Sequence, residues 1–99
     1  MAEYKNDDLG VSFEIPDKIT VRKQLAFYSA ASAFSGEMQY GRYWAAAMAV
    51  IENWKSELIP DPAKLDMDDE SNPSIATAII WVSNTAIAHL NRLEAVPKN

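Results

Sequence analysis

The chain contains no cysteine, which excludes a disulfide framework and a thiolate metal site and fits a cytosolic protein. It has one histidine and three glycines, and the glycines form no phosphate-binding loop. No apolar run approaches the ~18 residues that a membrane-spanning helix needs. Residues 1–8 hold three acids and one lysine, the opposite of a secretory signal peptide.

Positive charge is also scarce: the chain has nine Lys and Arg against fourteen Asp and Glu, which gives a net charge of −5. An acidic chain without a basic run is a poor candidate for general nucleic-acid binding. What the chain does have is a 48% apolar composition with three Trp, four Tyr and three Phe. We therefore expect one folded domain, residues 1–99, with a small core that buries somewhat over ~60% of the unfolded surface.

The strongest pattern lies between residues 40 and 58, where apolar or aromatic residues recur at alternating gaps of four and three. These residues are Tyr40, Trp44, Ala47, Ile51, Trp54 and Leu58. The spacing is that of one helical face and predicts a central helix over 38–57. We expect Trp54 to be mostly buried against the helices on either side.

Two further helices are predicted. Thr20 is a plausible N-cap for a helix over 21–34, and Gly36 follows it. Pro60 stops the central helix and opens an acidic linker over 58–72. Ser71 or Asn72 then caps a helix over 73–94. Its apolar stripe consists of Ile75, Ile79, Val82, Ala86, His89 or Leu90, and Leu93.

The predicted fold is mainly α, a three-helix domain with a short N-terminal extended arm or β-strand.

That arm is the alternating segment 11–15, which Pro16 ends. Residues 1–10 read as a loose N-terminus, although 2–5 offer a weak strand partner across 6–10. Two alternatives stay open. The arm lies extended on the helices, or it pairs as a strand within the chain or between two copies. We expect Val11, Phe13 and Ile15, or the helical faces, to mediate self-association into a homo-oligomer.

Catalytic and metal-binding patterns are weak. Asp66, Asp68 and Glu70 match three positions of a calcium loop, but Ser71 and Thr77 replace its defining Gly and Glu. His89 has no second histidine or cysteine near it and reads as an ordinary helix residue. We therefore expect no metal, no cofactor and no enzymatic activity.

A different kind of surface is suggested by methionine and tyrosine side chains among the small residues of the first two helices. Such residues line adaptable helix-binding grooves, but they also fill cores, and the sequence leaves both readings open. The candidate partner-binding residues are Tyr28, Met38, Tyr40, Tyr43 and Met48.

Several short motifs together resemble small proteins of tailed phages and prophages, of the tail assembly chaperone class. The motifs are Phe13-Glu-Ile-Pro-Asp17, Thr20-Val-Arg-Lys-Gln-Leu25, Phe27-Tyr28, Tyr40-Gly-Arg-Tyr-Trp44, Pro60-Asp61, Ile79-Ile-Trp81 and Leu93-Glu-Ala-Val-Pro-Lys-Asn99. They are structural rather than catalytic and cover nearly the whole length.

The resemblance implies a small, mainly helical protein of the host bacterial cytoplasm that binds a tape-measure protein or tail-tube subunit. It implies no enzymatic activity, no nucleic-acid or membrane partner, and no particular functional residue. The alternative is a small helical regulatory or ligand-binding phage protein.

Overall fold

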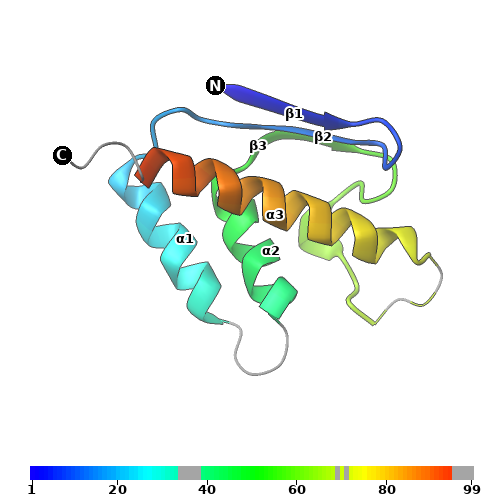
Figure 1. Cartoon of the computed structure of the whole chain (residues 1–99). Coiled ribbons are helices and arrows are strands. Elements are labelled where there is room, and N and C mark those ends of the chain that lie inside the picture. Colours follow the sequence, from blue (N-terminus) through cyan, green and yellow to red (C-terminus); the bar gives the residue numbers. More distant parts are fainter. Residues whose placement is uncertain (34–38, 69, 71, 95–99) are drawn as a thin grey trace.

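The computed structural model describes residues 1–33, 39–68, 70 and 72–94. A three-stranded antiparallel sheet lies on one side and the helices lie on the other (Figure 1). Along the chain the elements are β1 (Ala2–Asn6), β2 (Val11–Ile15), α1 (Val21–Ala33), α2 (Gln39–Val50), β3 (Glu52–Ser56), the 3-10 turn η1 (Pro62–Lys64) and α3 (Ser74–Glu94). The predicted mainly α, three-helix fold is therefore wrong: the protein is a small α/β domain.

The N-terminal hairpin accounts for the first part of this correction. Residues 2–6, predicted to be loose, form β1 and pair with β2 in the register that sets Tyr4 opposite Phe13. Gly10 closes the turn with a φ of +65°, which glycine adopts without steric cost. Of the two alternatives for segment 11–15, the structure shows strand pairing within the chain.

The second correction concerns the central helix, which was predicted to continue to residue 57 but ends at Val50. The last helical hydrogen bond joins the Ile51 amide to the Ala47 carbonyl at 3.0 Å. The chain then pairs with β2 as β3, since a lone hairpin would leave the second edge of β2 without hydrogen-bond partners. Val50, Ile51 and Asn53 are all weak helix formers, so little helical propensity is lost.

Trp54 consequently reaches the core from a strand. Its ring stacks on Phe13 with centroids 6.1 Å apart, and meets Trp44 edge to face at 5.8 Å. Its indole N–H donates to the Ile59 carbonyl at 2.8 Å. The side chain is half-buried rather than enclosed between helices as predicted.

The two flanking helices match their predictions closely. α1 begins after Thr20, whose Oγ1 accepts from the Lys23 amide at 3.1 Å. α3 follows Asn72, whose side chain accepts from the Ser74 amide at 2.9 Å. Most of the predicted stripe of α3 is buried, and Ile75 at its start is half-buried. The side chain of Leu93 lies outside the described ones. The buried stripe residues are Ile79, Val82, Ala86, His89 and Leu90. Ser71, the other cap candidate, lies outside the described residues.

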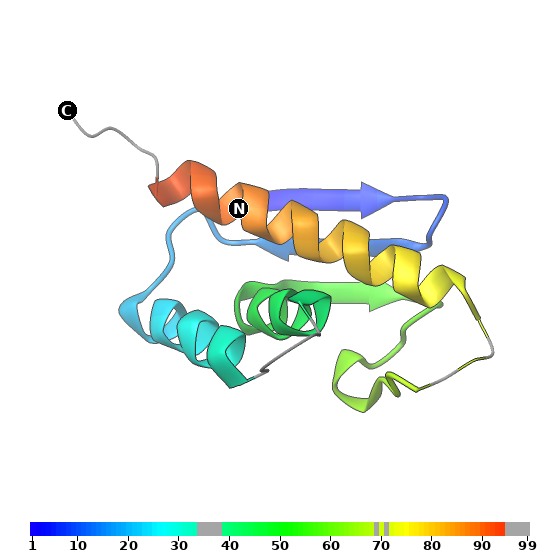
Figure 2. The same cartoon turned by 60° about the horizontal axis from the view of Figure 1, so that its bottom comes forward.

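The core lies between the sheet and the helices. Val11, Phe13 and Ile15 point inward from β2 and are at most 2% exposed. Side chains of α2 and α3 meet them, notably Trp44, Ala47, Ile79, Val82 and Ala86. The outer face of the sheet is polar and carries Glu3, Lys5, Ser12, Glu14 and Lys55. Figure 2 shows α1 and α3 on opposite flanks of α2, all on the same face of the sheet.

Candidate functional site

Among the helix side chains whose exposure the structure describes, the most exposed apolar ones lie on α1. Val21, Leu25 and Tyr28 are 71%, 62% and 55% exposed. Their spacing of four and three residues places them on one face of the helix. We call these three residues the α1 stripe. Large apolar groups that gather on one face of a small domain are typical of a surface that contacts another molecule.

A groove runs beside this stripe, between α1, α2 and α3. One part has a volume of about 310 Å³ and is lined by Phe27, Tyr28, Tyr43, Ala46, Ile87, Leu90 and Asn91. An adjoining part of about 270 Å³ shares Phe27, Tyr28 and Leu90 and extends to Asp17, Ile19, Gln24 and Val50. We call the two parts together the α1 groove. Among the described residues that line it, Asp17 is the charged one.

The position of α1 is set by contacts at its first turns. The Gln24 side chain donates to the Ile19 carbonyl at 3.0 Å. The Lys23 ammonium pairs with the Glu52 carboxylate of β3 at 3.1 Å. The ion pair joins the first turn of α1 to β3 on the side of the helix away from the stripe, so the stripe faces outward.

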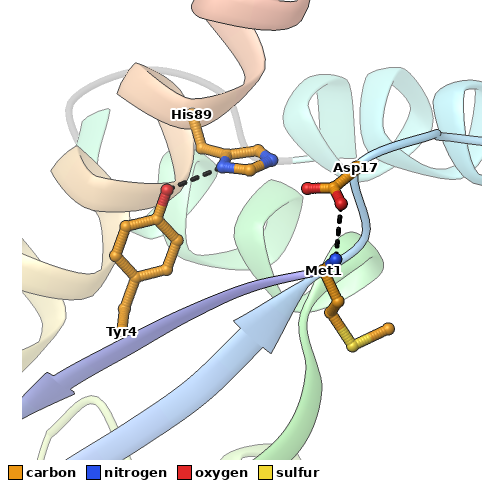
Figure 3. Close-up of polar contacts among 4 residues, drawn as sticks. All are labelled: Met1, Tyr4, Asp17 and His89. Atoms are coloured by element: carbon orange, nitrogen blue, oxygen red, sulfur yellow. Dashed lines mark hydrogen bonds and ion pairs between the residues drawn. The ribbon is translucent and has the colours of Figure 1, made fainter.

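A small polar cluster lies where the hairpin meets α3 (Figure 3). The Tyr4 hydroxyl and His89 Nδ1 are 2.7 Å apart, and the other ring nitrogen of His89 points toward Asp17. His89 is buried, and its Nε2 has no hydrogen-bond partner among the described residues. The hydrogen bond from the N-terminal ammonium of Met1, followed by that ammonium's charge, lowers the pKa of the Asp17 carboxyl.

This cluster joins three parts of the chain. Tyr4 lies on β1, His89 on the buried face of α3, and Asp17 in the connection to α1. Asp17 also lines the α1 groove, so the cluster fixes one end of that groove. Within the described ranges, no three His, Asp or Glu residues gather as a metal site would require.

The predicted partner-binding residues separate in the structure. Tyr28 and Tyr43 both line the α1 groove. Tyr40 is exposed and contacts the Tyr43 ring edge to face, with centroids 5.9 Å apart, but it lines a different hollow beside the start of α3. Met48 is half-buried against the core, and Met38 lies outside the described residues.

The predicted self-association residues are buried in the core of the domain. Val11, Phe13 and Ile15 are enclosed by α2 and α3 of their own chain, so they cannot meet a second copy without opening the domain. The alternation identified the buried face of β2 but not what covers it. Sequence reasoning missed Val21 and Leu25 as surface residues, although Leu25 and Tyr28 were visible on one helical face.

Comparisons with protein-family models, with curated proteins and with solved structures found no match to this chain. In the part of the chain that the structure describes, no helix has both the length and the apolar character to cross a bilayer.

Proposed function

We propose that this chain is a non-enzymatic phage tail assembly chaperone or a related morphogenesis factor. In this proposal it acts in the host bacterial cytoplasm. It binds an amphipathic helical segment of a tape-measure protein or tail-tube subunit.

The observation that carries the proposal is the pairing of the exposed α1 stripe with the α1 groove. A helix that docks in a groove presents apolar residues at i, i+3, i+4 and i+7. The α1 groove offers aromatic walls from Phe27 and Tyr43 and an aliphatic floor from Leu90. The stripe extends this apolar surface along α1, so one client helix can lie against both.

Charge supports the same reading. A long helical client with an uncovered apolar stripe aggregates unless its carrier keeps the complex in solution. A net charge of −5 on 99 residues opposes self-aggregation of such a carrier. The sequence motifs that resemble tail-module proteins indicate the class of client.

The test is co-expression with the tape-measure protein encoded in the same genome. We expect the wild-type chain to raise the soluble fraction of that protein and to co-elute with it in gel filtration. Leu25→Glu places a charge in the centre of the stripe and should abolish both effects. Lys55→Glu, on the outer face of the sheet, is the matched control and should leave both intact.

The contrary result is equally clear. If the tape-measure protein is as soluble without this chain as with it, and no complex survives gel filtration, the chaperone proposal is wrong. The alternative of a small regulatory or ligand-binding phage protein then takes its place.

A further inference from the structure

A second apolar surface lies on the other side of α2. It is a hollow of about 400 Å³ formed by the start of α2, the start of α3, and the preceding residues Asp66, Met67 and Glu70. Its exposed apolar residues are Tyr40, Met67 and Ile80, which are 39%, 38% and 42% exposed. Among the described residues that line it, Asp66 and Glu70 carry charge and none is basic. We call this surface the acidic groove.

An occupant of the acidic groove needs an apolar stripe flanked by positive charge, because burying apolar surface and pairing the rim charges both favour binding. The α1 stripe has this chemistry. Arg22 follows Val21 directly and precedes Leu25 by three residues, so its exposed side chain flanks the stripe. Lys18, also exposed, lies just before the helix.

The stripe cannot reach the acidic groove of its own chain. In both views α1 lies on one side of α2, and the segment from η1 to the start of α3 lies on the other (Figures 1 and 2). The complementary surfaces of one molecule therefore face in different directions. Contact between them requires two molecules.

We propose that the α1 stripe of one copy docks in the acidic groove of a second copy. Val21, Leu25 and Tyr28 span about 10 Å along the helix and enter the apolar floor. Arg22 meets the carboxylates of Asp66 and Glu70. Such an interface is heterologous: each copy uses one surface to bind and presents the other for binding, so the assembly grows head to tail.

This association involves this chain alone, and the argument for it does not rest on the proposed client. It also gives the stripe a partner in the absence of a client. A client helix that covers the stripe displaces the second copy, so client binding and self-association compete.

Two variants test the interface without disturbing the fold, because both positions are exposed. Leu25→Glu disrupts the α1 stripe and leaves the acidic groove intact. Ile80→Glu disrupts the acidic groove and leaves the α1 stripe intact. In analytical ultracentrifugation the wild type should associate, and each variant alone should be monomeric, with association weakened about 30-fold or more. Circular dichroism checks that both variants are folded.

Mixing the two variants is the decisive step. The Ile80→Glu variant still has an intact stripe, and the Leu25→Glu variant still has an intact acidic groove. An equimolar mixture should therefore form a one-to-one dimer that grows no further. A mixture that stays monomeric overturns the proposal, because it shows that the two surfaces do not bind one another. A wild type that is monomeric at millimolar concentration overturns it too.

Charge reversal provides an independent check. Arg22→Glu and Glu70→Lys should each weaken association about tenfold, and the double variant should restore it to near the wild-type level. Lys55→Glu is the control and should change nothing. If the double variant is as weak as the singles, these charges do not face one another and the assigned contact is wrong.

Discussion

At the scale of single residues, the contact between Tyr4 and His89 joins the sheet to the helical layer. Tyr4 pairs with Phe13 across the hairpin, and the centroids of their two rings are 5.6 Å apart. Its hydroxyl reaches the buried His89, which is 85 residues away in sequence. Local sequence patterns carry no information about such a contact. The sequence predicted that His89 lies on the apolar stripe of its helix, and the residue is buried there, but its partner Tyr4 was not foreseen.

This contact makes a testable contribution to stability. Tyr4→Phe keeps the ring but leaves Nδ1 of the buried histidine without its partner, which should lower the free energy of unfolding by about 1–3 kcal/mol. Tyr40→Phe is the matched control, because its ring is exposed, and should change stability by less than about 0.5 kcal/mol. Urea unfolding of both variants measures the difference. Equal stabilities would show that the bond contributes nothing.

The surface residues show why part of the site was predictable. Tyr28 and Tyr43 were chosen from their helical positions, and the structure brings them together at the α1 groove. Met48 was chosen alongside them as a candidate but packs against the core. Periodicity gives the face of a helix on which a residue lies. Whether that face is covered depends on the packing of other elements.

At the scale of elements, the first and third helices could be predicted because their caps and their periodicity agree. Thr20 and Asn72 accept backbone hydrogen bonds at the starts of α1 and α3. The central pattern was misleading because Trp44 and Trp54 fit one helical stripe, and the two rings do touch in the structure. A turn of the chain at Ile51 produces that contact without continuing the helix. The decisive factor, pairing with β2, is non-local.

Substitutions at Asn53 distinguish the strand from the predicted helix by the sign of their effect. Asn53 has a φ of +54°, and its side chain donates to the Glu14 carboxylate at 2.6 Å. Glycine and alanine both remove that bond, but only glycine accepts a positive φ without strain. Asn53→Ala should therefore be less stable than Asn53→Gly by about 1 kcal/mol. In a helix the order reverses, because glycine is the poorer helix former. Thermal unfolding of the pair decides between them.

At the scale of the whole molecule, the domain is asymmetric. One face of the sheet is polar and open, and the other supports a helical layer whose two flanks carry apolar surfaces of different character. Of the lining residues that the structure describes, the α1 groove has Asp17 as its charged residue, whereas the acidic groove has the two acids Asp66 and Glu70. The two proposed contacts, with a client at the α1 groove and with the stripe of another copy at the acidic groove, therefore fall on different flanks of the domain.

The most direct test of the client site is a titration of the isotope-labelled protein with a helical segment of the tape-measure protein, followed by amide chemical shifts. We predict that the largest shifts fall at Phe27, Tyr43 and Leu90, which line the α1 groove and lie outside the self-association contact. Glu3, Ser12 and Lys55, on the outer face of the sheet, should remain unchanged. Shifts confined to that sheet face, or no shifts at saturating peptide, would contradict the assignment of the α1 groove as the helix-binding site.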